Sequence, residues 1–177
     1  MASDSVMCIK RGELNGSLCN MFRDDLMQHI LSLPGHEHHF RSTKDEDSPR
    51  KMLLPDDSVF LYAETGPEHS PVPVGSISLI QLHSDSTHFR GLPSELNRVG
   101  EIKRMIVFED YRGNGVGRKL IEALEVVARD VLGLKYLVVE TVQALTAAQS
   151  LYQKAGYKRR QAWGLYDESS CCYEKWL

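Results

Sequence analysis

The chain has 177 residues, of which 42% are hydrophobic and 25% are charged, and this composition is typical of a single globular domain spanning residues 1–177. A formal net charge of -3 excludes a global positive field that would attract nucleic acid or an anionic membrane. The sequence has no secretory leader pattern and no apolar run long enough to span a bilayer, so we expect a cytoplasmic protein that binds neither membrane nor nucleic acid.

The first half of the chain predicts one strand, one helix and a hairpin. Residues 6–11 are typical of a strand, and from residue 17 to residue 33 apolar side chains recur at helical spacing until a Pro-Gly pair ends the helix. The polar stretch 36–57 is typical of a loop that gates a substrate site. Two apolar runs follow, at 58–64 and 73–82, and the Gly and Pro residues between them indicate a hairpin.

The second half begins with a polar loop at 83–97 and continues with a strand at 99–108. The next apolar residues have the spacing of one helix face, and Gly133 follows them where a C-terminal cap belongs. This predicted apolar stripe consists of Val116, Leu120, Ile121, Leu124, Val127, Ala128 and Val131. Charged residues occupy the opposite face, so the pattern predicts an amphipathic helix.

A strand at 135–142, a helix at 144–156 and closing strands at 158–165 and 171–176 complete the predicted elements. Their order contains a strand-helix-strand crossover in a chain that is otherwise rich in hairpins. We therefore expect an α/β (α+β) fold in which a mixed, mostly antiparallel central sheet carries helices on both faces.

The cysteines and a histidine cluster carry no predicted chemistry. The cysteines form no CxxC pair, and a disulfide between the adjacent pair would be strained, so we expect free thiols. These thiols are Cys8, Cys19, Cys171 and Cys172. His36, His38 and His39 in PGHEHHF have no second ligand pair at zinc spacing, so we expect a solvated loop there and no metal site.

The segment EDYRGNGVGRKL, residues 109–120, places three glycines between a predicted strand and a predicted helix. The P-loop of nucleotidases requires GxxxxGK followed by Ser or Thr, and here the spacing fails and the hydroxyl is missing. A dinucleotide fingerprint requires GxGxxG, whereas this chain has GxGxG with no acidic residue about 20 positions on. A helix-hairpin-helix DNA module requires a helix before the turn, where this chain has a strand. A glycine turn without a ligand is a further alternative.

Residues 112–117, RGNGVG, resemble the (Q/R)xxGx(G/A) motif of the GNAT superfamily of N-acetyltransferases, in which this loop cradles the pyrophosphate of acetyl-CoA. The resemblance extends from Gly100 to Tyr157 and implies the GNAT fold, acetyl-CoA as the acetyl donor and an amine as the acceptor. A phosphate fits here physically, because backbone N–H groups converge at the positive N-terminus of a helix and glycines leave room for its approach.

By resemblance, the strand before the loop separates from its neighbour and presents backbone groups to the pantetheine arm, while Arg118 reaches the phosphates. The residues assigned to the cofactor in this way are Met105, Ile106, Val107, Arg112, Gly113, Asn114, Gly115, Val116, Gly117 and Arg118. The chain departs from the family pattern at Leu145, where many relatives carry an Asn that contacts the pantetheine. Thr141, Gln143 and Thr146 are the candidates to take over that contact.

Two residues are predicted to carry protons. A lysine-like amine, with a pKa of about 10.4, must lose a proton before it attacks, which costs about 4.6 kcal/mol at pH 7. Glu101, eleven residues before Arg112, matches the general base of the histone-acetylating branch of the family, and its structural alternative is an ion pair with Lys103 or Arg104. Tyr152, in LYQKAGY, matches the tyrosine that protonates the departing coenzyme A thiolate, and its alternative is a packed core tyrosine.

The sequence therefore predicts an N-acetyltransferase that transfers acetyl directly to a primary amine in a ternary complex, since no cysteine near the motif suggests an acyl-enzyme. His83, His88 or an ordered water are the other candidates for the base. We expect a small or amino-acid-like acceptor, with protein or peptide acetylation and a non-catalytic acyl-CoA sensor as alternatives. The segments expected to form the acceptor site, 36–57 and 158–173, match no specific pattern. We expect a monomer or homodimer.

Overall fold

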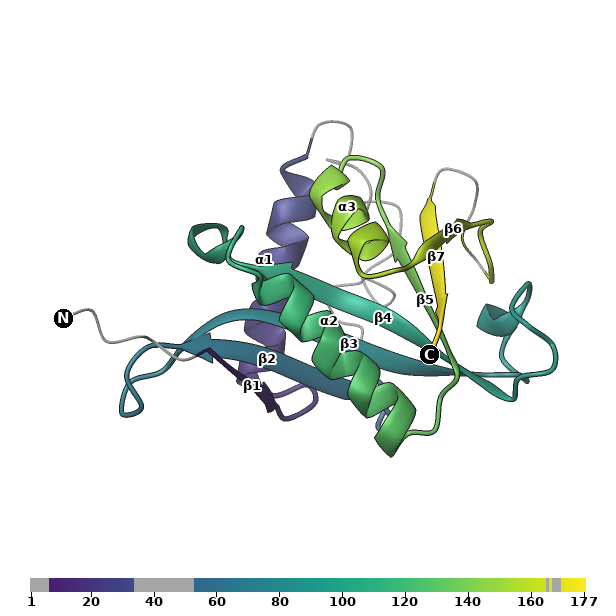
Figure 1. The fold of residues 1–177 in the computed structure, drawn as a ribbon, viewed down its shortest axis with the longest axis horizontal. Helices are drawn as coiled ribbons and strands as arrows, with labels where there is room; N and C mark the ends of the chain where they lie inside the picture. The colour runs from purple at the N-terminus through teal and green to yellow at the C-terminus, as the bar shows by residue number, and fades with distance from the viewer. Residues whose placement is uncertain (1–6, 34–52, 165, 167–169) are drawn as a thin grey trace.

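The computed structural model describes residues 7–33, 53–164, 166 and 170–177. Within them a seven-stranded sheet has the order β1-β2-β3-β4-β5-β7-β6 (Figure 1). Its strands are β1 (Cys8–Arg11), β2 (Val59–Thr65), β3 (Val72–His83), β4 (Arg98–Val107), β5 (Tyr136–Thr141), β6 (Lys158–Arg160) and β7 (Cys171–Trp176). The helices are α1 (Ser17–Leu31), α2 (Val116–Val126) and α3 (Thr146–Lys154), with shorter helical turns η1 (Thr87–Phe89), η2 (Glu109–Tyr111) and η3 (Val127–Val131).

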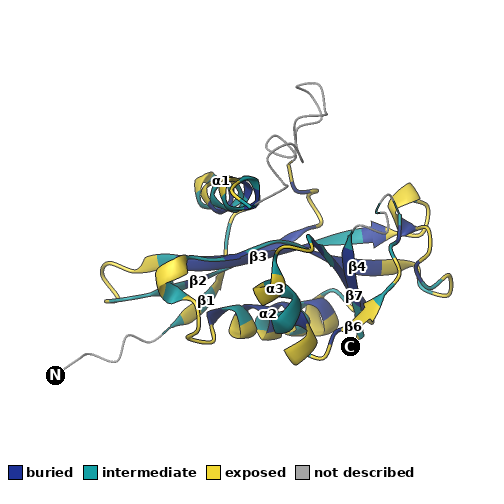
Figure 2. Cartoon of the chain, turned by 90° about the horizontal axis from the view of Figure 1, so that it is seen from above, coloured by how far each residue is buried: buried dark blue, intermediate teal, exposed yellow. Residues whose placement is uncertain are grey.

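The sheet separates two helical layers. Helix α1 covers one face, and α2 and α3 cover the other, as the view from above shows (Figure 2). Strands β4 and β5 are parallel, whereas every other pair of neighbouring strands is antiparallel. The predicted mixed, mostly antiparallel sheet with helices on both faces is therefore confirmed.

The largest core lies between the sheet and the α2 and α3 layer. Leu120, Ile121 and Leu124 of α2 are fully buried there. Because burying one such side chain contributes about 1.5–3 kcal/mol, the apolar stripe is sufficient to fix α2 against the sheet. A smaller cluster, which includes Phe22 of α1 and Ile106 of β4, joins the opposite face to α1.

The segment after α2 departs from the predicted helix. The N–H of Leu132 donates to the carbonyl of Val127 at 3.1 Å, which is a π-helical bond. The wider turn rotates the last residues away from the stripe, so Val131 is 66% exposed and its predicted place in the core is wrong. Gly133 ends the segment as predicted, with a left-handed φ of +67°.

The predicted strand at 158–165 is shorter than expected. Strand β6 ends at Arg160, and the N–H of Gly164 donates to the carbonyl of Arg90 at 2.8 Å instead of extending the ladder with β7. The predicted first helix also ends early, at Leu31.

Three further expectations concern the gating loop, the cysteines and membrane-spanning helices. Residues 36–52 of the predicted gating loop, with His36, His38 and His39, lie outside the described residues. All four cysteines are free, as predicted, with Cys8 exposed and the others buried. In the part of the chain that the structure describes, no helix combines the length and apolar character needed to cross a membrane.

A bulge in β4 changes which residues face each layer. Arg104 has a left-handed backbone, with φ of +52°, and the pairing with β3 is irregular there. Ile102 packs in the core under α2 and α3, yet Ile106, which regular alternation would place on the same face, packs against the α1 cluster. Glu101 therefore faces the α1 layer, whereas Met105 packs against the core on the other side.

Strands β4 and β5 separate at the same place. They pair only over Gly100 to Ile102 of β4. Beyond Ile102, β4 continues to Val107 and β5 to Thr141 without pairing to each other. The strands thus diverge where the resemblance implied that they would.

Candidate active site

A cavity of about 1450 Å³ lies where β4 and β5 separate. Its wall combines residues of α1 from one face of the sheet with residues of the glycine loop, α2 and α3 from the other. The predicted site residues that line it are Glu101, Met105, Ile106, Val107, Arg112, Gly113, Gly115, Val116, Gly117, Arg118 and Tyr152. Asn114 does not belong to this wall, and its amide donates to the Arg112 carbonyl at 3.4 Å.

The glycine loop contains two left-handed residues that face open space. Gly113 and Gly115 have φ of +79° and +77°, which a residue with a Cβ adopts only with strain. A Cβ at either position would meet no atom within 4 Å. Gly117 differs, because a Cβ there would lie 2.9 Å from Leu151 of α3. Two glycines thus leave room for a ligand, and the third permits close packing of the helices.

Helix α2 begins directly after this loop. Gly115 is its N-cap and supplies no side chain to cap the helix. The first backbone N–H groups of a helix have no intrahelical acceptor, and the helix dipole makes this end positive. The Nε of Arg112 donates to the carbonyl of Val107 at 2.9 Å, which ties the loop to the end of β4. This geometry fits a phosphate that accepts several backbone N–H bonds.

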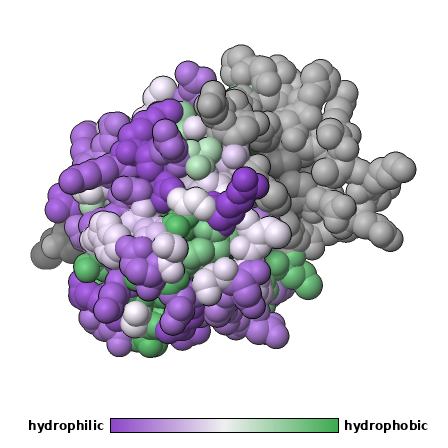
Figure 3. All heavy atoms as spheres, turned by 90° about the vertical axis from the view of Figure 1, so that its right-hand side faces the viewer, coloured by the Kyte–Doolittle hydropathy of each residue, from purple (hydrophilic) through white to green (hydrophobic). Residues whose placement is uncertain are grey.

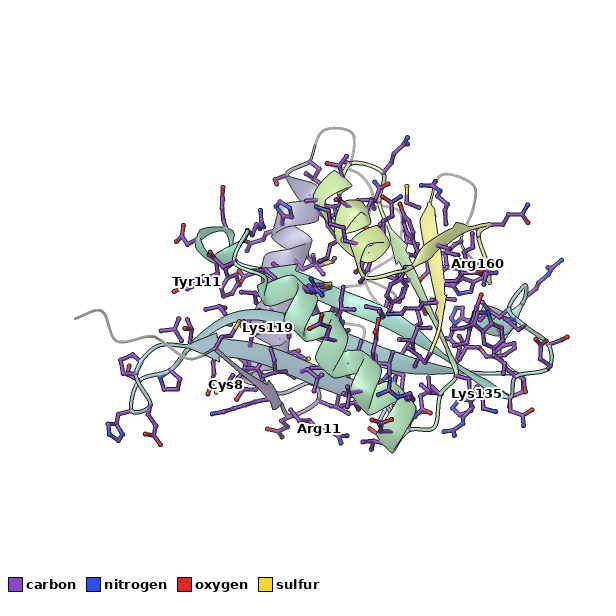
Figure 4. The ribbon with its side chains drawn as sticks, in the orientation of Figure 1. Cys8, Arg11, Tyr111, Lys119, Lys135 and Arg160 are labelled. Atoms are coloured by element: carbon purple, nitrogen blue, oxygen red, sulfur yellow. The ribbon has the colours of Figure 1, made fainter. Side chains whose placement is uncertain are left out.

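Arg118 and Tyr111 are two further side chains that line the cavity near the glycine loop. Arg118 is 75% exposed and pairs with Glu122 one turn along α2, at 2.7 Å. The Nε of its guanidinium is therefore engaged by Glu122, while Arg118 also lines the cavity. Tyr111 of η2 also lines the cavity, beside the loop (Figure 4).

Glu101 is a buried carboxylate held by two neighbours. It is 3% exposed, and its Oε1 accepts a hydrogen bond from the Tyr166 hydroxyl at 2.6 Å. Lys103 Nζ lies 2.8 Å from the same oxygen, contacts the Tyr166 hydroxyl and lies 4.8 Å from the centre of the Tyr166 ring. The expected ion pair is thus formed with Lys103, while Arg104 lies beside Cys19 of α1, with 4.0 Å between guanidinium and sulfur.

Tyr152 of α3 lies on the side of the strand separation opposite Glu101. It is 4% exposed, and its hydroxyl lies 3.5 Å from the sulfur of Met105. Burial, with a smaller contribution from the Glu140 carboxylate, raises the pKa of this phenol well above its ordinary value. Tyr152 therefore stays protonated at neutral pH and is able to donate a proton into the cavity.

The end of β5 and the turn between β5 and α3 supply further residues of the cavity wall. Thr141 and Leu145 both line the cavity, whereas Gln143 and Thr146 do not belong to the wall. Thr141 is 7% exposed. Among the three candidates to replace the usual Asn, Thr141 is therefore the one whose position fits.

The end of the cavity near Glu101 has an apolar and aromatic wall. Leu26 and Ile30 of α1 line it, and so do Trp163 and Tyr166, whose rings lie 5.0 Å apart. Residues 158–173 are part of the segments expected to form the acceptor site, but no pattern in the sequence singles out Trp163 or Tyr166. Both follow the short strand β6, where no periodic pattern marks a functional side chain.

A network around Arg160 holds this wall in place (Figure 4). Arg160 donates to the Gly91 carbonyl at 2.7 Å and to the Tyr136 hydroxyl at 2.9 Å, and it pairs with Glu174 at 3.3 Å. These contacts join the loop between β3 and β4 to β5, β6 and β7. The face seen from this end is mainly hydrophilic, with smaller apolar areas among the described residues (Figure 3).

Neither thiols nor metal ligands gather in the described part of this site. No cysteine lines the cavity, and burial raises the pKa of the Cys172 thiol to about 11. Within residues 7–33, 53–164, 166 and 170–177, no group of three or more His, Cys, Asp or Glu side chains is arranged to hold a metal ion.

Comparison with known proteins agrees with this geometry. The sequence profile of the Acetyltransferase (GNAT) family matches residues 21–157. A stretch of 67 residues is 40% identical to the IAA acetyltransferase of Azospirillum brasilense, and this match covers 38% of the chain and 43% of that protein, which is less than half of the relative's length.

Solved structures share the fold over nearly the whole chain. A Klebsiella pneumoniae subsp. pneumoniae protein assigned to the acyl-CoA N-acyltransferases aligns with a TM-score of 0.67 at 23% identity, over 97% of this chain and 98% of that one. Arabidopsis thaliana NAA60, solved in complex with acetyl-CoA, aligns with a TM-score of 0.65 at 15% identity, over 97% and 99% of the two chains. Because the family profile matches residues 21–157, the greater part of the chain, the chain belongs to the acetyltransferase (GNAT) family.

Proposed function

We propose that this protein transfers the acetyl group of acetyl-CoA to the primary amine of a small or amino-acid-like acceptor, by direct transfer in a ternary complex. The observation that carries the proposal is the single cavity, which extends from the glycine loop past Tyr152 to Glu101. A donor site and a proton-accepting carboxylate would thus share one cavity, as direct transfer requires.

The donor would be held at the end of the cavity near α2. The backbone around Gly113 and Gly115 and the start of α2 would bind the phosphates, and Met105 to Val107 would present β4 backbone groups to the pantetheine. Acetyl-CoA, when bound, supplies an acetyl group activated as a thioester. Thr141 is our candidate for the polar contact that Leu145 does not provide.

Two side chains would handle the protons. Glu101 would accept a proton from the ammonium form of the acceptor, which makes the nitrogen nucleophilic. Tyr152, kept protonated by burial, would donate a proton to the departing thiolate. Because Glu101 and Tyr152 lie on opposite sides of the strand separation, one would act on the acceptor and the other on the donor.

The wall around Glu101 supports an organic amine as the acceptor. Leu26, Ile30 and Trp163 would contact the apolar part of such a molecule, while the buried carboxylate would bind its ammonium group. The same cavity also carries polar side chains, among them His83 and His88, the alternative candidates for the base.

The proposal is tested by measuring coenzyme A release with acetyl-CoA and three acceptor classes: amines, amino acids and peptides. Release that depends on an amine or amino acid supports the proposal, and release only with peptides would identify a peptide acetyltransferase. In parallel, acetyl-CoA at 100 times its Kd should stabilise the fold by about 2.7 kcal/mol, measured as a rise in Tm. Stabilisation without release for any acceptor would indicate a sensor, and no stabilisation at millimolar acetyl-CoA would refute the donor site.

A further inference from the structure

We propose that Lys103 is a self-acetylation site, whose ε-amine accepts an acetyl group from the donor bound in the same molecule. The inference rests on the proposed function and on the surroundings of the Lys103 ammonium group. A carboxylate oxygen lies 2.8 Å from Nζ, the Tyr166 hydroxyl contacts it, and the Tyr166 ring lies 4.8 Å away. Carboxylate, phenol and aromatic face are groups that bind a primary ammonium ion, so Lys103 occupies the subsite expected of an acceptor.

The position of Glu101 favours Lys103 as the amine that gives up its proton. A general base must lie within about 2.6–3.2 Å of the group whose proton it takes. Lys103 Nζ meets this condition in the structure. Since Glu101 is only 3% exposed and is in contact with both Lys103 and Tyr166, an external amine must displace Lys103 to reach the same oxygen.

The cavity that Lys103 lines also contains the proposed donor side. Lys103 stands two residues before Met105 on β4, and both residues line the cavity. The Tyr152 hydroxyl, our proposed donor of a proton to the thiolate, lies 3.5 Å from the Met105 sulfur. Lys103, the proposed base and the proposed acid therefore line one cavity.

The transfer conserves atoms and charge. The Lys103 ammonium gives one proton to Glu101, and its nitrogen then attacks the thioester carbonyl carbon. A C–N bond forms as the C–S bond breaks, and the thiolate takes a proton from Tyr152. The nitrogen loses its second proton to solvent, and Tyr152 regains its proton by way of Glu101 or solvent. The products are acetyl-Lys103 and coenzyme A, and no oxidant or further reactant is needed.

The chain contains a matched comparison lysine. Lys175 Nζ lies 2.7 Å from Glu125, and the Lys175 side chain is 25% exposed, against 28% for Lys103. Lys175 does not line the cavity. The two lysines are thus buried to a similar extent, and each forms its own ion pair. They differ because only Lys103 lines the cavity that would hold the donor. Lys119 and Lys135, which are exposed (Figure 4), report uncatalysed acetylation of surface amines.

The experiment incubates the full chain with acetyl-CoA and no acceptor, and follows each lysine by peptide mass spectrometry. We expect Lys103 to be acetylated at least about tenfold faster than Lys175, Lys119 and Lys135. Its rate constant should not depend on protein concentration, because the reaction is intramolecular. Glu101→Gln should slow acetylation of Lys103 by about 10²-fold or more and leave the exposed lysines unchanged.

A second readout does not require acetyl transfer. Reductive methylation with formaldehyde labels accessible lysine amines, and bound coenzyme A should protect Lys103 but not Lys175. If acetyl-CoA raises the Tm while Lys103 is acetylated no faster than Lys175, or if coenzyme A leaves Lys103 unprotected, the inference is overturned and the proposed donor site stands. If acetyl-CoA does not raise the Tm, the proposed function fails and the inference fails with it.

Discussion

Tyr152 and Tyr157 are neighbours in the core, yet only Tyr152 lines the cavity. Their ring centres lie 5.8 Å apart, and burial raises the pKa of both phenols above the ordinary value. Both are almost completely buried. They therefore form a natural pair for separating a role in proton donation from a role in packing.

Tyr152→Phe is expected to lower kcat by about 10²-fold, because a proton donor is removed while the ring that packs the core is kept. Acetyl-CoA affinity, measured by calorimetry, should change little. Tyr157→Phe removes a hydroxyl outside the cavity wall and should leave kcat within a factor of about two. Equal losses in the two variants would assign the effect to packing.

Glu125 is a matched control residue for Glu101, since each carboxylate pairs with a partly buried lysine. Glu101→Gln should lower kcat/KM by about 10²-fold or more and preserve the Tm shift with acetyl-CoA. Glu125→Gln should reduce stability, measured by urea unfolding, with kcat/KM unchanged. If Glu101→Gln keeps the wild-type pH profile of kcat/KM, then a histidine such as His83 or an ordered water becomes the candidate base.

At the scale of elements, the separation of β4 and β5 coincides with a one-residue irregularity in β4. The bulge at Arg104 moves Ile106 to the α1 face, and pairing with β5 stops at Ile102. The glycine loop then connects β4 to α2 with two left-handed residues. Strand, bulge, loop and helix thus act as one unit that places a helix N-terminus beside an open strand edge.

Gly115→Ala tests this unit, and Gly133→Ala is its matched control. Gly115 has φ of +77° and Gly133, at the far end of the helical segment, has φ of +67°, and both have open surroundings. Each substitution to Ala should reduce the free energy of unfolding by about 1–2 kcal/mol, measured in urea. Only Gly115→Ala should also weaken acetyl-CoA binding, by about tenfold or more, since its Cβ faces the proposed phosphate site. Equal affinities in the two variants would contradict that site.

At the scale of the whole molecule, the fold buries several phenols that titrate normally in the unfolded chain. Burial is the largest cause of the raised pKa at Tyr152, Tyr157 and Tyr166. Above pH 10 the unfolded chain loses these protons while the native protein keeps them, so a rising pH favours unfolding. Below pH 10 both states hold the protons, and the effect vanishes.

The free energy of unfolding is therefore expected to fall as the pH rises above about 10, by up to about 1.4 kcal/mol per pH unit for each of these tyrosines. Urea unfolding at a series of pH values between 8 and 11 measures the slope. Tyr157→Phe should make the slope shallower, because one buried titrating group is removed. A slope that is the same in that variant would contradict the assignment.

Much of the fold was predictable because it depends on local patterns. Periodicity gave the order of strands and helices, and the glycine loop gave the start of α2. The bulge at Arg104 was not predictable, since nothing in the residues around it requires a left-handed backbone. Val131 was misassigned because helical periodicity does not anticipate a π-helical turn.

The predicted site was incomplete for a related reason. Glu101 and Tyr152 were found by resemblance and do line the cavity, but Tyr166 reaches Glu101 across 65 positions of sequence. Such a contact depends on tertiary packing, and no local pattern signals it. Arg118 illustrates the opposite case, because its partner Glu122 lies one helical turn away and was within reach of local reasoning.

The strand separation has a consequence for the order of events in the proposed reaction. Glu101 faces the α1 layer, whereas the glycine loop leads into α2 on the other face of the sheet (Figure 2). Donor and acceptor would therefore arrive from different directions, and neither would block the other's route. Coenzyme A could depart while the acetylated product is still bound, or the reverse. Steady-state kinetics of this protein should then follow a random sequential scheme.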